Sequence, residues 1–296
     1  MEYVIETKEL TKRYGSKTAV NHISMHVKKG AIYGLIGKNG AGKTSLMKLI
    51  LGLTTPNEGE ISLLNGSNIY QARRKTGSLI EAPALYKNET AFENMKRFSL
   101  ISPASDKEIR ELLKIVGLDN TKKKKAGEFS LGMRQRLGIA IALLGHPDLL
   151  ILDEPINGLD PAGIKEIRDI ILRLNHSGVT FVISSHLLDE LGKIATDYGI
   201  VSGGNLIEEI SQKNLEERCR ASLRIVTDNT DKTVSVLKSW NKNIKLETLG
   251  TDISILSEIE DSSYINHMLV SSGIKVYEIK NESIGFEDFF IERLGR

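Results

Sequence analysis

The stretch GKNGAGKT, residues 37–44, constrains the fold of this chain more than any other feature of the sequence. It fits the pattern G-x-x-x-x-G-K-[ST] in full, and it lies between a short apolar run, AIYGLIG, and KTSLMKLILG, whose apolar residues have helical spacing. Glycines here let backbone N–H groups converge on a polyphosphate without Cβ clashes, and the helix N-terminus adds its positive dipole end. We therefore predict a strand, a phosphate-binding loop and a helix, with Lys43 on the β and γ phosphates and the Thr44 hydroxyl on Mg²⁺. The predicted loop contacts come from Gly37, Asn39, Gly40, Ala41 and Gly42.

A second run, LLILDEP at residues 149–155, is an apolar strand that ends in two adjacent carboxylates. Mg²⁺ prefers oxygen ligands, so Asp153 is placed to hold it, directly or through water. Glu154 would then act as the base for the water that attacks the γ phosphate. An acidic pair after an apolar strand is a weak signal alone, but the phosphate loop in the same chain makes it strong. Together the two stretches predict a site that binds and hydrolyses a nucleoside triphosphate with Mg²⁺.

The pattern of apolar residues divides the chain into two parts. Up to about residue 205 strands alternate with helices, which predicts an α/β fold of the P-loop NTPase type with a mostly parallel sheet. Helical patterns replace the strands over about residues 81–145, for example after the capping-box sequence SDKE, so we expect a helical insert there. From about residue 210 the order of patterns is β-α-β-β-α-β and a terminal helix. We expect residues 1–209 to form a nucleotide-binding domain and residues 210–296 a small α+β accessory domain.

Composition argues against several other classes of protein. The chain has 40 basic and 38 acidic residues, a balance that gives no electrostatic argument for direct nucleic-acid binding. The single cysteine, Cys219, excludes an internal disulfide framework and suits a reducing compartment. The longest apolar tract, residues 137–152, is interrupted by polar residues and is shorter than the roughly 20 residues that a bilayer requires. We therefore expect a cytoplasmic chain whose link to any membrane runs through a partner.

Several further motifs, in the order in which they occur, are similar to those of the ATP-binding cassette (ABC) ATPases. The stretch FSLGMRQR, residues 129–136, resembles the signature usually written LSGGQxQR. The resemblance implies that Ser130 and the amide of Gly132 cap the γ phosphate of an ATP held by a second subunit. The stretches NGLDP and ISSHLLDE place Asp160 at the D-loop position and His186 at the switch-histidine position. The motifs extend over about residues 3 to 210, and the resemblance implies that two copies of the chain enclose two ATP molecules.

A segment that precedes the phosphate loop carries two more candidates. Tyr14, in KRYGSKTAV, matches the aromatic residue that stacks on adenine in this family, and Thr18 is a further candidate contact to the nucleotide. Taken alone, Tyr14 has a packing explanation and an isolated histidine such as His186 has a structural one. The resemblance over the whole set of motifs makes them candidates for the nucleotide site.

The sequence departs from the common family pattern at three positions. Leu131 and Met133 replace a glycine and a glutamine of the signature. Glu81, at the end of a short apolar run, stands where the family usually has a glutamine that touches Mg²⁺ and the attacking water. Read alone, Glu81 is a solvated strand end. The stretch LIEAPALYKNETAFENM is similar to the bacitracin-export and lantibiotic-immunity branch, so we interpret Glu81 as a catalytic and metal-binding residue.

The resemblance implies the ATP-hydrolysing subunit of a bacterial ABC transporter that exports a peptide antibiotic. It also implies a separate transmembrane permease and a location on the inner face of the cell membrane. The alternative is an ABC-type mechanical ATPase that acts on DNA or ribosomes. Such proteins usually join two cassettes or insert a long coiled coil, and neither pattern occurs in this sequence. A binding module without hydrolysis is disfavoured because Lys43, Asp153, Glu154 and His186 are all present.

Overall fold

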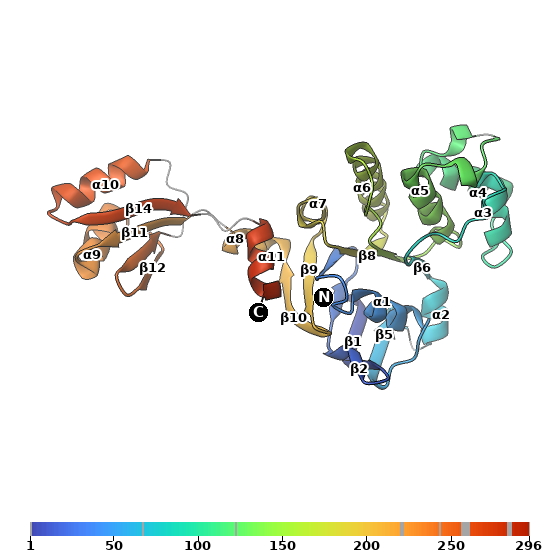
Figure 1. Cartoon of the computed structure of the whole chain (residues 1–296), viewed down its shortest axis with the longest axis horizontal. Helices are drawn as coiled ribbons and strands as arrows, with labels where there is room; N and C mark the ends of the chain where they lie inside the picture. Colours follow the sequence, from blue (N-terminus) through green and yellow to red (C-terminus); the bar gives the residue numbers. More distant parts are fainter. Residues whose placement is uncertain are drawn as a thin grey trace. The chain divides into compact units, whose positions relative to one another are not determined.

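The computed structural model describes residues 2–66, 68–121, 123–219, 222–242, 244–255, 261–282 and 286–295. The chain divides into two compact units, Met1–Gln212 together with Arg293–Arg296, and Lys213–Glu292 (Figure 1). In the described part of the chain, every helix is too short or too polar to cross a lipid bilayer.

A six-stranded sheet forms the centre of the first unit, in the order β10-β9-β4-β8-β7-β6. All neighbours pair in parallel except β9 and β10, which are antiparallel. Strands β4, β7 and β8 are buried at every position, which explains why their sequences are continuous apolar runs. The strands are β4 (Ile32–Ile36), β6 (Thr76–Leu79), β7 (Leu149–Asp153), β8 (Thr180–Ser185), β9 (Asp197–Ser202) and β10 (Asn205–Ser211).

A second, antiparallel sheet was not expected from the sequence. Its long strand β1 (Tyr3–Tyr14) pairs with β2 (Lys17–Ile23), β3 (His26–Lys28) and β5 (Glu58–Leu63). Exposed and buried positions are mixed along β1, so its sequence lacks the apolar run that marks the strands of the central sheet. Helix α1 (Lys43–Leu51) lies between the two sheets (Figure 1), and all three contribute residues to one apolar core.

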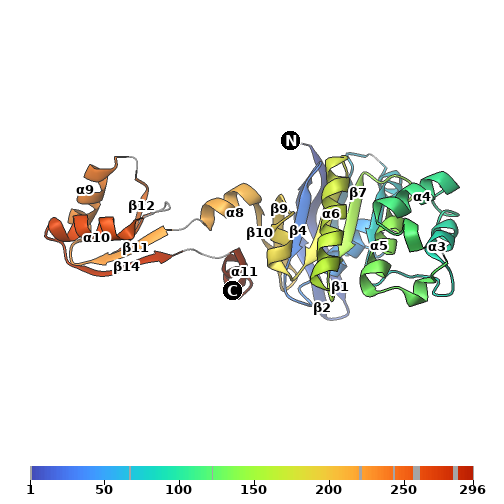
Figure 2. The ribbon, with the colours of Figure 1, turned by 90° about the horizontal axis from the view of Figure 1, so that it is seen from above.

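Helices cover the rest of the central sheet. Helices α6 (Pro161–His176) and α7 (Leu188–Gly192) lie on the side opposite α1 (Figures 1 and 2). Asp160 caps α6 and Pro161 is its first residue, as the sequence predicts. The short helix α2 (Ile69–Arg74) connects β5 to β6.

The predicted helical insert lies beyond the edge strand β6 (Figures 1 and 2). Its N-cap side chains Thr90 and Ser105 both form capping boxes, and the second of these is the one predicted from the SDKE sequence. The elements are α3 (Ala91–Phe98), α4 (Asp106–Ile115), the short 3₁₀ turns Asp119–Thr121 and Ala126–Glu128, and α5 (Leu131–Ala142).

The second unit has its own antiparallel sheet, in the order β12-β13-β11-β14, and its own core, which includes Leu223, Ile225 and Ile265. The order of elements is the β-α-β-β-α-β order predicted from the sequence. The elements from the end of β10 onward are α8 (Gln212–Arg218), β11 (Ser222–Thr227), α9 (Thr230–Trp240), β12 (Leu246–Leu249), β13 (Asp252–Ile255), α10 (Ser262–Ser271), β14 (Val276–Glu282) and α11 (Phe286–Gly295). The fold class predicted from the sequence is therefore confirmed.

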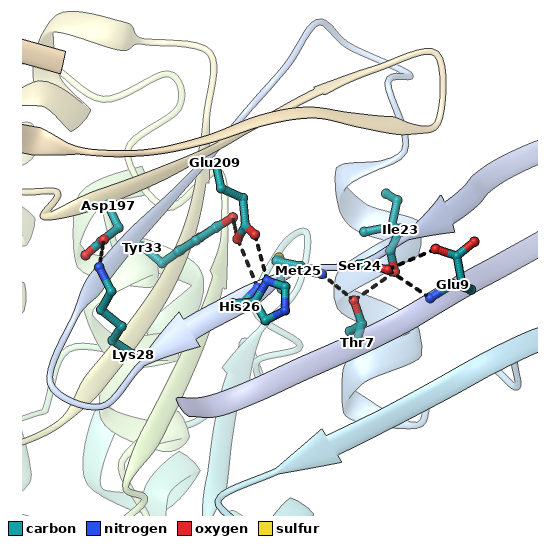
Figure 3. Close-up of polar contacts among 10 residues, drawn as sticks. All are labelled: Thr7, Glu9, Ile23, Ser24, Met25, His26, Lys28, Tyr33, Asp197 and Glu209. Atoms are coloured by element: carbon teal, nitrogen blue, oxygen red, sulfur yellow. Dashed lines mark hydrogen bonds and ion pairs between the residues drawn. The ribbon is translucent and has the colours of Figure 1, made fainter. Parts of the chain in front are cut away.

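A polar network at the amino end of β4 joins the two sheets of the first unit (Figure 3). The Tyr33 hydroxyl donates to Glu209 Oε1 at 2.7 Å, and the same oxygen accepts the His26 backbone N–H at 2.9 Å. Glu209 Oε2 lies 2.9 Å from Nδ1 of the His26 ring. Burial, and then the Glu209 carboxylate, raises the pKa of the Tyr33 hydroxyl well above its usual value. The Tyr33 ring needs a glycine beside it, because a Cβ on Gly199 would lie 2.2 Å from the hydroxyl oxygen.

Figure 3 shows two further polar contacts near this network. Lys28 Nζ donates to Asp197 Oδ1 at 2.6 Å, and this hydrogen bond raises the pKa of the Lys28 ammonium. The buried Thr7 hydroxyl donates to the carbonyl of Ile23 and accepts the N–H of Met25, both at 2.9 Å. The amino end of the central sheet is thus held by paired polar groups.

Candidate nucleotide site

The predicted phosphate loop leaves the carboxyl end of β4 and leads into α1. Two of its glycines are required by close backbone contacts. A Cβ on Gly37 would lie 2.4 Å from the Val201 carbonyl oxygen, and one on Gly42 would lie 2.3 Å from the Ala19 carbonyl oxygen. Gly42 also has a φ of +110°, which disfavours any L side chain. The glycine spacing in the sequence therefore reflects real steric limits of this loop.

Lys43, the first residue of α1, is 5% exposed. Its ammonium donates to the carbonyl oxygens of Gly37 at 2.6 Å and Lys38 at 3.4 Å, and it lies 3.4 Å from Glu154 Oε1. A buried ammonium next to a loop of backbone N–H groups is a strong attraction for a polyphosphate. The side chain is thus held at the phosphate loop, in contact with Glu154.

The acidic end of β7 meets the start of α1. The Thr44 hydroxyl donates to Asp153 Oδ2 at 2.7 Å, and the Ser184 hydroxyl donates to Asp153 Oδ1 at 2.6 Å. Asp153 itself is 5% exposed. Ser184 also accepts the backbone N–H of Glu154 at 2.8 Å, so it contacts both acidic residues, one through its carboxylate and the other through its backbone. Ser184 was missed in the sequence, although it is the next-to-last residue of the strand TFVISS, two residues before His186.

Glu154 is held in an unusual conformation. Its φ is +48°, in the left-handed region that non-glycine residues seldom adopt. Its Oε2 lies 2.7 Å from Nδ1 of His186, which brings together two residues predicted to act in hydrolysis. Its Oε1 is buried and, among the described residues, has no hydrogen-bond partner. Backbone strain at a carboxylate that contacts both a buried lysine and a histidine is typical of a functional site.

These residues surround a cavity of about 270 Å³. Tyr14, which is 48% exposed, lines this cavity, and Lys12 Nζ lies 5.2 Å from the centre of its ring. Thr18 does not line the cavity, whereas its neighbours Lys17 and Ala19 do. The lining residues are Tyr14, Lys17, Ala19, Asn39, Gly40, Ala41, Gly42, Lys43, Thr44, Ser45, Asp153 and Glu154.

Besides Thr18, six predicted residues lie outside this lining: Gly37, Glu81, Ser130, Gly132, Asp160 and His186. Ser130 caps α5 by accepting the Met133 N–H at 3.2 Å, and Gly132 lies in the first turn of that helix. Asp160 caps α6 by accepting the Gly163 N–H at 3.1 Å. Glu81, which has a φ of +61°, pairs instead with Lys48 of α1. This ion pair lowers the pKa of Glu81 and raises that of Lys48.

The oxygen atoms of Thr44 and Asp153 fit the preference of Mg²⁺ for hard oxygen ligands. Among the described residues, no group of three or more His, Cys, Asp or Glu side chains is arranged to hold a metal ion. This agrees with Mg²⁺ chemistry, because that ion is commonly bound by one or two protein oxygens together with substrate phosphates and water.

A parallel sheet with a phosphate loop, a buried lysine and two carboxylates at the strand ends defines a P-loop nucleotide hydrolase. The comparisons with known proteins make the class specific. The ABC transporter family matches residues 20–157. The bacitracin transport ATP-binding protein BcrA of Enterococcus faecalis is 40% identical over 300 residues, which cover 100% of this chain and 97% of the relative. The chain therefore belongs to the ATP-binding proteins of ABC transporters, and it is an ATPase.

Two other relatives match about three quarters of the chain. The lantibiotic transport ATP-binding protein SrtF of Streptococcus pyogenes is 45% identical over 217 residues, covering 72% of this chain and 95% of the relative. The solved structure of CbiO1 from Clostridium perfringens, part of an ABC transporter complex, has a TM-score of 0.66 and 26% identity. The match covers 73% of this chain and 91% of the CbiO1 chain. The likeness to these proteins thus extends over a smaller share of the chain than the likeness to BcrA does.

Proposed function

We propose that this ATPase powers the export of a bacitracin-type peptide antibiotic through a separate transmembrane permease, and so protects the cell. The observation that carries this proposal is the extent of the likeness to BcrA. It covers 100% of the chain, whereas the likeness to the lantibiotic transport protein covers 72%. The second unit is therefore shared with a bacitracin transport protein, and the bacitracin class is favoured over lantibiotics.

The roles of the site residues follow from their positions around the cavity. Lys43 and the loop N–H groups would bind the β and γ phosphates of ATP, and Tyr14 would stack on adenine. Thr44 and Asp153 would hold Mg²⁺, which when bound neutralises charge on the phosphates. Glu154 would take a proton from the attacking water, and its Oε1, which lies 3.4 Å from the Lys43 ammonium, would be released when Lys43 binds the phosphates. His186 would hold the other Glu154 oxygen, from which it lies 2.7 Å away.

A second copy of the chain would complete the site. Ser130, Gly132 and Asp160 do not line the cavity of their own chain. Ser130 and Asp160 stand at the amino ends of α5 and α6, where helix dipoles favour an anion. We expect these residues to face the phosphates bound by the partner copy. The pair of ATPase subunits would sit on the inner face of the membrane, attached through the permease.

The test is antibiotic tolerance in a sensitive bacterial host. The chain is produced together with a candidate permease from the same genome, and tolerance to bacitracin and to a lantibiotic is measured. We expect tolerance to bacitracin to rise, and to fall to the level of the empty host with Lys43→Ala or Glu154→Gln. Lys107→Ala, an exposed change on α4, is the matched control and should preserve tolerance. A rise for the lantibiotic alone would contradict the bacitracin assignment, and no rise for either compound would contradict the export proposal.

A further inference from the structure

Glu81 and Lys48 form an ion pair next to the nucleotide site. Lys48 Nζ donates to Glu81 Oε1 at 2.8 Å, and the two side chains are 35% and 67% exposed. Lys48 follows Thr44 by four residues on α1, so both side chains lie on the same face of that helix, one turn apart. The ammonium that holds Glu81 is therefore one helical turn from the Thr44–Asp153 hydrogen bond.

The sheet register brings Glu81 to the same edge as the two site carboxylates. Strand β6 pairs in parallel with β7, and Leu79 lies opposite Leu152. The chain after β6 therefore leaves the sheet beside Asp153 and Glu154, which follow Leu152. Glu81 thus lies at the same edge of the sheet as Asp153 and Glu154, although it does not line the cavity, and a further negative charge at this edge opposes triphosphate binding unless a cation compensates it.

We propose that Lys48 is a positioning residue that makes Glu81 compatible with a bound triphosphate. Its ammonium neutralises the Glu81 carboxylate and fixes it beside the nucleotide site, an inference that rests on the proposed function of this site. A carboxylate only accepts hydrogen bonds, whereas an amide both donates and accepts. In the Lys48–Glu81 pair the carboxylate accepts hydrogen bonds and the ammonium donates them, so the pair offers both functions that a single glutamine amide has.

The backbone at Glu81 supports a positioning role. Its φ of +61° lies in the left-handed region, which a side chain with a Cβ disfavours. Glu81 also starts the connection from β6 to α3, the first long helix of the insert. The ion pair to α1 therefore holds a strained turn that links the phosphate-loop helix to the insert.

The experiment uses the full chain and measures the equilibrium affinity for ATP, once with Mg²⁺ and once with EDTA. We expect Lys48→Met to weaken ATP binding by about twofold to fivefold with Mg²⁺, the range for a partly exposed charge pair. The loss should be larger with EDTA, because no metal charge then offsets Glu81. Adding Glu81→Gln to Lys48→Met should restore the affinity in both conditions, and Lys48→Arg should preserve it.

The matched control is Lys96→Met, which breaks a similar ion pair of 2.7 Å to Asp106, between α3 and α4, and should leave ATP affinity unchanged. Unchanged affinity in Lys48→Met would overturn the proposal. So would a loss that Glu81→Gln does not restore, or a loss of equal size with and without Mg²⁺, because each indicates a merely structural lysine. These measurements need neither permease nor antibiotic, so their failure is distinguishable from failure of the export proposal.

Discussion

The two ends of the central strand β4 carry polar clusters of opposite character. At the amino end, Tyr33, Glu209 and His26 satisfy one another through three contacts of 2.7–2.9 Å (Figure 3). At the carboxyl end, Glu154 is strained, and its buried Oε1 has no hydrogen-bond partner among the described residues. One strand of five residues thus separates a paired cluster from an incomplete one.

This difference indicates which end of β4 carries the functional site. Buried polar groups in folded proteins are nearly always paired, because an unpaired one costs about 1–3 kcal/mol of stability. The amino end follows this rule and holds the two sheets of the first unit together. The carboxyl end departs from it at one atom, because Glu154 Oε1 has, within the described part of the chain, no hydrogen bond and only an ion pair of 3.4 Å with Lys43, and we expect a ligand to complete this atom. Changes at the carboxyl end should therefore alter catalysis and binding, and changes at the amino end should alter stability.

The largest effect is expected for Glu154→Gln. Removal of a general base lowers the rate of hydrolysis by about 100-fold to 10,000-fold, while the phosphate loop keeps binding ATP. A dimer should then accumulate with ATP, and steady-state turnover with size-exclusion chromatography checks both outcomes.

The matched control is the same exchange at the paired end, Glu209→Gln. It should leave turnover within about threefold of the parent, because Glu209 does not line the cavity. If Glu154→Gln also stays within about threefold, Glu154 is not the base.

The next effect is expected for Gly42→Ala. The added Cβ would lie 2.3 Å from the Ala19 carbonyl oxygen at a φ of +110°, so the phosphate loop must shift. We expect ATP affinity to fall by about tenfold or more, as strain of 1–3 kcal/mol implies. Gly178→Ala is the control, because Gly178 has a φ of +103° with open space around its Cβ position. It should lower stability and leave ATP affinity unchanged, whereas equal losses of affinity would refute the steric argument.

The carboxyl end of β4 was largely predictable from the sequence, and the amino end was not. The phosphate loop, Lys43 and the strand ending in Asp153 are local patterns, and a local pattern suffices to place them at one edge of a parallel sheet. Ser184 escaped notice because a serine at a strand end has no signature of its own. Its role depends on the pairing of β7 with β8, which brings Ser184 opposite Asp153.

The paired end depends on contacts between residues far apart in the sequence. Tyr33 and Glu209 are 176 positions apart, and no motif links them. The pairing of Glu81 with Lys48 was missed for the same reason, although each residue belongs to a segment that was singled out. The antiparallel sheet around β1 was not predicted because β1 pairs with three other strands. The spacing of apolar residues does not indicate which strands pair or in which register.

A smaller effect, on stability alone, is expected for Tyr33→Phe. The change removes a buried hydroxyl that donates to a carboxylate, and a hydrogen bond to a charged group contributes about 1.5–3 kcal/mol. We expect the free energy of unfolding in urea to fall by about that amount, with ATP affinity unchanged. Tyr70→Phe, at an exposed tyrosine, should change stability by less than about 0.5 kcal/mol. A loss of ATP affinity in Tyr33→Phe would break the separation between the two ends of β4.

The smallest effect on the nucleotide site is expected when the second unit is removed. We propose that the two units are separate domains, because every residue that lines the cavity precedes residue 155 and the second unit has a core of its own. A chain that ends at Gln212 loses the ion pair of 2.7 Å between Arg293 and Glu208, and a partly exposed pair contributes only about 0–1 kcal/mol. Its ATP affinity should therefore stay within about twofold of the full chain, once circular dichroism shows that it is folded. A folded truncation that no longer binds ATP would show that the site depends on the second unit, and the boundary near residue 210 would then not separate two domains.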